Sequence, residues 1–242
     1  MEELSIICCW NNKEQFEGLI DGLQNQTIVP EIIGINNSGN RFSSCSAALN
    51  SVIDSIKTKY VIYMHQDIRF VTTTTIEEIL NYLYKIKEND ILGVVGAFNS
   101  KNLVKTNIYI GKNLHYGSDS RLKGIEECFS LDECLFGGLT SRFIKYKFDE
   151  EVCNNWHLYA VDQCLYNIIY GYKVYACDVT LIHISEGTIN QIYNTGFRDL
   201  CKKYANSLKK IYTPCCYASN TNFVSRWIYF IKNSIRIKVQ NE

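Results

Sequence analysis

Apolar residues along this chain follow two alternating patterns, short continuous runs and segments in which they recur every three or four positions. The continuous runs are rich in β-branched and aromatic side chains and predict buried strands at residues 4–9, 31–36, 60–64, 91–96 and 173–177. The segments of helical spacing predict amphipathic helices, among them residues 45–56, 75–86 and 158–170. This alternation is typical of an α/β domain in which helices cover a mostly parallel central sheet.

Two parts of the chain depart from this alternation. Between residues 97 and 128 the pattern loosens into short strand-like pieces punctuated by glycine, which predicts inserted hairpins. From residue 188 onward the spacing favours helices outside the core. Because no internal repeat or low-complexity linker occurs, we predict one α/β domain at residues 1–187 and a helical C-terminal extension at residues 188–242 that packs on it. At the start of the helix 75–86, Thr75 and Glu78 have the spacing of a capping box.

Three polar residues, His65, Gln66 and Asp67, directly follow the predicted strand at residues 60–64. In open α/β sheets ligands bind beyond the carboxyl ends of the strands, so these side chains lie where a site is expected. The carboxylate of Asp67 supplies the hard oxygen ligands that Mg²⁺ and Mn²⁺ prefer. The alternative interpretation is a strand-end carboxylate that caps the next helix.

Composition narrows the class of protein. Lysine and arginine total 25 and so do the acidic residues, which argues against a general binder of nucleic acid or of acidic surfaces. The eleven cysteines are odd in number and include no Cys-x-x-Cys, so we expect reduced core thiols in a cytoplasmic protein. The first strand begins too early to leave room for a signal peptide, and no apolar run approaches the ~20 residues that cross a bilayer.

Several motifs between residues 4 and 187 resemble the family-2-like glycosyltransferases with the GT-A fold. The His65–Asp67 motif is similar to the branch named after a streptomycin-biosynthesis protein, which favours His-Gln-Asp over Asp-x-Asp. Ala47-Ala-Leu-Asn50 resembles an Ala-Arg-Asn segment in which Leu49 replaces the arginine, so that Arg41 or Arg69 becomes the candidate cation. Residues 148–150, Phe-Asp-Glu, match the turn that leads to the family's acceptor helix.

The resemblance implies an activity and a set of site residues. The activity is inverting transfer of a sugar from a UDP- or TDP-sugar to a hydroxyl of a glycan or lipid-linked acceptor, in cell-surface glycan or polysaccharide biosynthesis. Asp67 and His183 are then the ligands of a Mn²⁺ or Mg²⁺ cofactor, although a lone histidine on an apolar strand is otherwise typical of a core. The residues expected to contact the nucleotide sugar are Cys9, Trp10, Asn36, Asn37, Asn50, His65 and Gln66.

The acceptor side has its own candidates. In the resembling family an aspartate before an apolar strand borders the acceptor pocket, and Asp132 holds that position. Trp156 offers a flat apolar face for a sugar ring or for core packing, and His157 follows it. Asp162 lies at the edge of the inward stripe of the helix 158–170, where a carboxylate is rarely found unless it is paired or functional. We predict that Asp162 is the general base, with a structural salt bridge or cap as the alternative.

The C-terminal extension is basic. Residues 201–242 contain one acid, Glu242, and eight bases, namely Lys202, Lys203, Lys209, Lys210, Arg226, Lys232, Arg236 and Lys238. Trp227 and Phe230 lie among them, a composition that favours peripheral contact with the inner face of a membrane, or else an amphipathic helix packed on the domain itself or on a partner subunit. Two other functions stay open for the whole chain: a nucleotidyltransferase, and a non-catalytic nucleotide-sugar-binding protein of the same fold.

Overall fold

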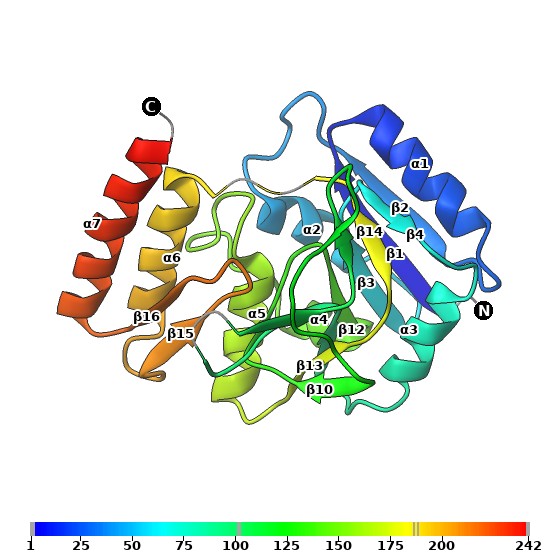
Figure 1. Cartoon of the computed structure of the whole chain (residues 1–242). Coiled ribbons are helices and arrows are strands. Elements are labelled where there is room, and N and C mark those ends of the chain that lie inside the picture. The colour runs from blue at the N-terminus through cyan, green and yellow to red at the C-terminus, as the bar shows by residue number, and fades with distance from the viewer. Residues whose placement is uncertain (1–2, 101–102, 186, 188, 241–242) are drawn as a thin grey trace.

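The computed structural model describes residues 3–100, 103–185, 187 and 189–240. Residue 188, at the predicted domain boundary, and Glu242 lie outside the described residues. A seven-stranded sheet forms the centre of the molecule (Figure 1). Its order is β10 (Ile125–Glu127), β13 (Val174–Cys177), β5 (Ile91–Gly93), β12 (Leu135–Leu139), β3 (Tyr60–Met64), β1 (Leu4–Trp10) and β2 (Glu31–Asn36).

Most strands of this sheet point the same way. The strands β1, β2 and β3 are mutually parallel, and β5 and β13 share their direction because β12 is antiparallel to both β3 and β5. Only β12 and the edge strand β10 run in the opposite direction. The predicted α/β class with a mostly parallel central sheet is therefore confirmed.

Helices cover both faces of the sheet: α1 (Lys13–Gln24), α2 (Cys45–Ile53), α3 (Thr75–Leu83), α4 (Thr140–Lys145) and α5 (Tyr159–Ile169). Two further helices, α6 (Gln191–Lys203) and α7 (Phe223–Gln240), stand beyond α5 at one side of the molecule (Figure 1). Along β3, Val61 and Tyr63 join the core under α2, α4 and α5, whereas Ile62 and Met64 join the core under α1 and α3. A strand buried on both faces needs apolar residues at every position, which is why this run is continuous in the sequence.

Three smaller sheets complete the fold. One contains β4 (Ile68–Phe70), β14 (Leu181–His183), β8 (Tyr109–Ile110) and β9 (His115–Tyr116), and a second contains β11 (Ser130–Leu131), β6 (Val95–Ala97) and β7 (Val104–Thr106). The third is a hairpin of β15 (Lys210–Tyr212) and β16 (Ala218–Asn220). No helix in the described part of the chain combines the length and apolarity needed to cross a bilayer.

Three local predictions need correction. The run at residues 91–96 divides at Val94 into β5 and β6, because β5 pairs with the central sheet and β6 with β7. The helix α3 has Thr74, not Thr75, at its N-cap, and the Thr74 hydroxyl bonds the Glu78 side chain rather than a backbone N–H. The C-terminal segment contains the β15–β16 hairpin as well as helices.

Candidate active site

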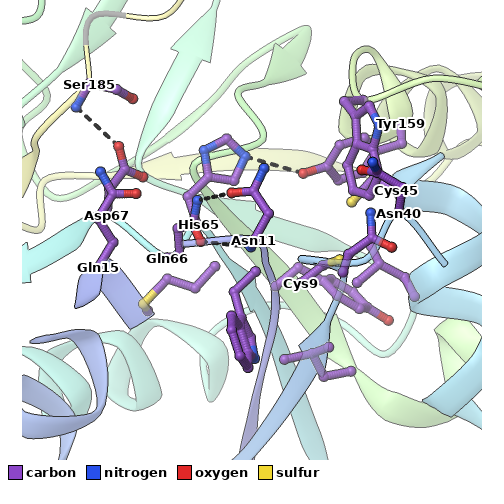
Figure 2. A pocket seen from close by; sticks show the side chains of 17 residues that line it. Cys9, Asn11, Gln15, Asn40, Cys45, His65, Gln66, Asp67, Tyr159 and Ser185 are labelled. Carbon is purple, nitrogen blue, oxygen red and sulfur yellow. Dashed lines mark hydrogen bonds between the residues drawn. The ribbon is translucent and has the colours of Figure 1, made fainter. Parts of the chain in front are cut away.

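A cavity of about 380 Å³ opens at the carboxyl ends of β1 and β3 (Figure 2). Its wall combines the ends of these strands with α2, the start of α5 and the segment after β14. Asp67 is the one carboxylate among the described residues of this wall, and none of them is a lysine or arginine. The lining residues are Ile7, Cys9, Trp10, Asn11, Gln15, Asn37, Asn40, Cys45, Leu49, Tyr63, Met64, His65, Gln66, Asp67, Trp156, Tyr159 and Ser185.

The turn at residues 65–67 links two sheets, since β3 belongs to the central sheet and β4 to the four-stranded one. Gln66 holds this turn against the loop after β1. Its Oε1 accepts the backbone N–H groups of Asn11 (3.0 Å) and Asn12 (2.9 Å), and its Nε2 donates to Asn11 Oδ1 (2.9 Å). Its side-chain amide is therefore used to join the β3–β4 turn to the N-terminus of α1, where Asn12 is the N-cap.

The pairing of β14 with β4 brings a second histidine to this turn. His183 lies opposite Ile68, and the N–H of Ile184 donates to the Asp67 carbonyl oxygen (3.1 Å). His183 Nε2 lies 3.3 Å from Asp67 Oδ1 and 3.4 Å from His65 Nδ1. Within the described residues, His65, Asp67 and His183 form a group whose ligand atoms all lie within 4.8 Å of one another.

The three side chains fit a divalent metal ion. Ligand atoms bonded at ~2.1 Å and separated by angles near 90–110° lie ~3.0–3.4 Å apart, close to the two shorter separations in this group. The other nitrogen of His65, Nε2, lies 3.3 Å from the Tyr159 hydroxyl, which directs Nδ1 toward the group. Two imidazoles and one carboxylate suit a transition-metal ion better than Mg²⁺, which prefers oxygen ligands.

The ionisation of His65 and Asp67 suits the same role. Burial, and then the neighbouring His183, lower the pKa of His65 to about 4, so its ring is neutral and free to act as a ligand at pH 7. Burial opposes ionisation of Asp67, but hydrogen bonds with His183 and Ser185 outweigh it and hold the pKa of the carboxyl below its usual range. The N–H of Ser185 donates to Asp67 Oδ2 (3.0 Å), as Figure 2 shows.

The predicted nucleotide-binding residues divide into two groups. Cys9, Trp10, Asn37, His65 and Gln66 all line the cavity. Trp10 also stacks on Phe16 of α1, with ring centroids 4.9 Å apart. The Asn37 amide is engaged with the backbone of Phe42, both as donor (3.2 Å) and as acceptor (2.8 Å), so it shapes the loop after β2.

Asn36 and Asn50 lie outside the cavity lining. Asn36 is exposed, and its side-chain oxygen accepts the N–H (2.9 Å) and hydroxyl (2.7 Å) of Ser38. Asn50 bonds the backbone of Phe148 from both ends of its amide and also donates to Glu150 (2.8 Å). Asn50 thus connects α2 to the turn before α5, and its amide is engaged there rather than in the cavity wall.

The two candidate arginines also lie outside the cavity. The Arg69 guanidinium donates to the carbonyl oxygens of Gln15 (3.0 Å) and Ile68 (2.8 Å) and packs on Gly18 of α1. Arg41 is exposed and lies over the Phe42 ring. The structure therefore offers no replacement for the family's arginine among the described residues of the wall.

On the acceptor side, Asp132 lies in the turn between β11 and β12. Its Oδ1 accepts the N–H of Cys134 (2.9 Å), whose carbonyl oxygen accepts the N–H of His65 (3.0 Å). Burial lowers the pKa values of His65 and His157, and the negative charge of Asp132 partly opposes this. Burial also acts to lower the pKa of His183, but Asp67 and then Asp132 outweigh it and raise that pKa. The turn that carries Asp132 is therefore joined to the backbone of His65, and its carboxylate is only partly exposed.

The segment before α5 carries the other two acceptor candidates. Trp156 lines the cavity and is 41% exposed, so its face is available to a ligand. His157 lies outside the lining, where its ring packs edge-on against Tyr193 at 5.4 Å. Of the three acceptor candidates, Trp156 alone is part of the cavity wall.

Asp162, the predicted general base, lies outside the lining of the cavity. Its side chain is buried on the side of α5 that meets α6, where Oδ1 accepts hydrogen bonds from Lys203 Nζ (2.6 Å) and the Tyr204 hydroxyl (2.8 Å). Burial alone would lower the pKa of Lys203, but Asp162 and Asp149 outweigh it and raise that pKa. The geometry supports the alternative of a structural salt bridge.

Replacing Asp162 by asparagine is therefore expected to lower stability rather than activity. Breaking a buried ion pair costs about 3–5 kcal/mol, and retention of the Lys203–Asp149 contact (2.8 Å) brings the expected loss to ~1–3 kcal/mol. The melting temperature should fall by roughly 3–10 °C. Calorimetry measures the loss of stability, and nucleotide binding shows whether the site remains intact. The control is Asp54→Asn, which removes an exposed ion pair with Lys147. Unchanged stability with lost turnover would restore the catalytic assignment.

Two further residues, Tyr159 and Glu133, shape the site without a distinctive signal in the sequence. Tyr159 contacts His65 from the first residue of α5, and a tyrosine at a helix start carries no distinctive signal. The buried Glu133 accepts the N–H of Leu158 (2.6 Å), the left-handed N-cap residue of α5. Burial, and then Asp132, raise the pKa of Glu133 to about 8. Glu133 therefore holds the start of α5 beside the cavity.

The raised pKa of Glu133 makes stability depend on pH. The folded protein binds the Glu133 proton more tightly than the unfolded chain does. The contribution of this group to the free energy of unfolding is therefore complete below its unfolded pKa, near 4.5, and is lost as pH rises through 8. Glu133→Gln keeps the acceptor oxygen and removes the titration. Melting temperatures of the wild type and of this variant are compared between pH 5 and 9 in the presence of a metal chelator. The wild type should lose several degrees relative to the variant as pH rises, since a change of ~1 kcal/mol in the free energy of unfolding shifts the melting temperature by ~2–4 °C. The same dependence of melting temperature on pH in both proteins would contradict the pKa shift.

Comparison with known proteins gives a family match and a fold match. A model described as a glycosyltransferase-like family matches residues 5–185, and no curated protein matches in sequence. The mannosyltransferase PcManGT from Pyrobaculum calidifontis, in complex with GDP-Man and Mn²⁺, superposes with a TM-score of 0.54 and 9% identity over 85% of this chain and 63% of that chain.

A second solved protein gives a similar result. The 1–349 portion of S. aureus TarS, alone and in complex with UDP-GlcNAc, gives TM-scores of 0.53 at 11% and 9% identity. These matches cover 86% of this chain and 66% and 67% of theirs, so the chain spans about two thirds of the length of the structures it resembles. The structural likeness confirms the predicted GT-A-like fold.

Proposed function

The chain belongs to the glycosyltransferase-like family, and on that basis we propose that it transfers a sugar from a nucleotide-diphosphate donor to a hydroxyl group of an acceptor. The cavity at the ends of β1 and β3 is the proposed donor site. Its wall includes Trp10 and Cys9 at the end of the first strand, and its metal-ligating group lies at the end of the third. The opening beside Trp156 is the proposed entrance for the acceptor.

The observation that carries this proposal is the combination of a three-residue metal-ligating group with a wall that contains no lysine or arginine among its described residues. A nucleotide diphosphate brings negative charge to a wall whose one carboxylate is Asp67. A divalent cation held by His65, Asp67 and His183 would neutralise the diphosphate and the further charge that develops as it leaves. Donor binding is therefore proposed to depend on Mn²⁺ or a similar ion, with Mg²⁺ as the weaker choice.

The proposed base is Asp132 rather than Asp162. Asp132 is a partly exposed carboxylate close enough to His65 and His183 to influence their protonation, and its turn is bonded to the His65 backbone. In the proposed reaction its carboxylate takes the proton of the acceptor hydroxyl as that oxygen attacks the anomeric carbon. Attack opposite the diphosphate inverts the configuration at that carbon.

The donor and the setting follow the family resemblance. We propose a UDP- or TDP-sugar donor and a glycan or lipid-linked acceptor, in cytoplasmic synthesis of a cell-surface glycan or polysaccharide. PcManGT was solved with GDP-Man and TarS with UDP-GlcNAc, so both uridine and guanosine donors belong in the test. Peripheral membrane contact through the basic C-terminal helices is part of the same proposal.

Incubation of the protein with UDP-, TDP- and GDP-sugars in the presence of Mn²⁺ or of EDTA tests the proposal. Slow release of free sugar and nucleoside diphosphate, dependent on Mn²⁺ and on one donor, is the expected result for a glycosyltransferase without its acceptor. Formation of a nucleoside triphosphate from pyrophosphate and the sugar donor would identify a nucleotidyltransferase instead. Tight donor binding without turnover, even with added hydroxyl acceptors, would identify a non-catalytic nucleotide-sugar-binding protein.

A further inference from the structure

The helix α7 presents an apolar face to solvent at the edge of the molecule. It lies beyond α6, with its far side uncovered in the part of the chain that the structure describes (Figure 1). Asn233 and Ile237 point toward the protein and are buried. The opposite side, called here the outer face of α7, has large apolar side chains that are between 38% and 66% exposed: Val224, Trp227, Ile228, Ile231, Ile235 and Val239.

Such a face needs a partner. Six large apolar residues at helical spacing form a continuous stripe from residue 224 to residue 239, about 22 Å long at 1.5 Å per residue. Isolated apolar residues are common on protein surfaces, but a contiguous exposed stripe marks an interaction site. The helix α7 therefore has two packing surfaces, an inner one that contacts the rest of the protein and an outer apolar one that is free to contact a partner.

The charge around the outer face shows which partner fits. The helix carries four bases and no acid, and the described chain contains no acidic residue after Asp199. In the described ranges none of these bases forms an ion pair. Lys232 and Lys210 line one surface hollow together with Ile228, so positive charge directly borders the apolar stripe. The four bases are Arg226, Lys232, Arg236 and Lys238.

We propose that the outer face of α7 docks on a bilayer that contains anionic phospholipid. A helix lying in the interface buries its apolar side among the acyl chains, while its lysines and arginines reach the headgroups. A second copy of this chain is a poorer partner, because pairing two outer faces would bring the three exposed bases of each helix, Lys232, Arg236 and Lys238, close to those of the other with no acid between them. The docking is peripheral, as no described helix is suited to cross the bilayer.

The docked orientation places the cavity near the membrane. Ser234 of α7 accepts hydrogen bonds from Gln191 (3.0 Å) and Asn194 (3.0 Å) in the first turn of α6. Gln191 is six positions after Ser185 of the cavity wall, a reach of at most about 20 Å. If the proposed function holds, on which this step alone rests, the acceptor is a hydroxyl group carried by a membrane lipid.

Flotation of the full chain with vesicles tests the docking. The probes are phosphatidylcholine vesicles with and without about 30 mol % phosphatidylserine, at about 50 mM salt. We expect the wild type to partition at least ~10-fold more strongly onto the anionic vesicles than onto the neutral ones. The double variant Ile231→Asp/Ile235→Asp should partition onto the anionic vesicles at least ~10-fold more weakly than the wild type. Lys232→Glu/Arg236→Glu should weaken binding by about fivefold per charge and remove its dependence on phosphatidylserine. The matched controls, Val29→Asp and Lys57→Glu, alter exposed loop residues outside α7 and should bind as the wild type.

Three results would overturn the docking. Absence of flotation by the wild type, or equal flotation by the α7 variants, removes the lipid surface as the partner. A dimer in light scattering that Ile231→Asp/Ile235→Asp converts to a monomer assigns the face to a second copy. Mn²⁺-dependent UDP binding, measured on every variant, shows that the site remains folded. If flotation succeeds while UDP binding fails in the wild type, the docking stands and the proposed function falls.

Discussion

Replacing Asp67 by asparagine is expected to abolish the dependence of UDP binding on Mn²⁺. The wild type should bind UDP at least ~100-fold more tightly with Mn²⁺ than with EDTA, because the described cavity wall has no basic side chain to neutralise the diphosphate. Asparagine retains an acceptor for the Ser185 N–H but removes the anionic ligand. Titration calorimetry with and without the ion should then give nearly equal, weak affinities for the variant.

The two histidines provide a graded comparison. His65→Ala and His183→Ala each remove one neutral ligand and should weaken Mn²⁺-dependent binding by at least ~10-fold. Asp21→Asn, which alters an exposed carboxylate on α1, is the matched control and should behave as the wild type. Full Mn²⁺-dependent affinity in Asp67→Asn would show that the metal-ligating group has been assigned incorrectly.

Asp132→Asn is expected to reduce turnover by about 10²–10⁴-fold while leaving the affinity for the donor within about threefold of the wild type. The reason is that proton removal from the acceptor occurs only as the hydroxyl attacks, after the donor is bound. The amide keeps the hydrogen bond to the Cys134 N–H, so the turn next to His65 should persist. Single-turnover rates and donor binding, measured on the same preparation, separate the two effects.

Two neighbouring carboxyl groups serve as controls for Asp132. Glu133→Gln changes the adjacent residue, whose side chain supports Leu158, and Asp162→Asn changes a carboxylate bonded to Lys203. Both variants should keep most of their turnover at a temperature where they are folded. A variant of Asp132 that turns over normally and is altered only in acceptor KM would return this residue to acceptor binding, the role that the sequence predicts.

The centre of the sheet could be predicted from the sequence because strands such as β1 and β3 are buried on both faces. Each position of such a strand must be apolar, and the runs at β1 and β3 therefore stand out without any knowledge of what covers them. The break at Val94 could not be predicted in this way. Both halves of that run are equally buried, and only their pairing partners, β12 and β7, separate them.

Site residues at the end of a strand could be predicted from the sequence. Residues whose role depends on a partner distant in sequence could not. His65 and Asp67 follow β3, so their place at the sheet edge follows from the fold class. Helical periodicity put Asp162 on an inward face, but it carries no information about which neighbour fills that face. The neighbour is Lys203, whose Nζ reaches the carboxylate from a helix 41 residues later.

The anomalous scattering of manganese in crystals soaked with UDP and Mn²⁺ would show where the ion binds. We expect one strong anomalous peak about 2.0–2.3 Å from His65 Nδ1, Asp67 Oδ1 and His183 Nε2, and at a similar distance from an oxygen of the UDP diphosphate. We also expect the nucleoside in the cavity beside Trp10. A manganese peak away from these three residues, or UDP bound outside the cavity, would contradict the assignment of the site.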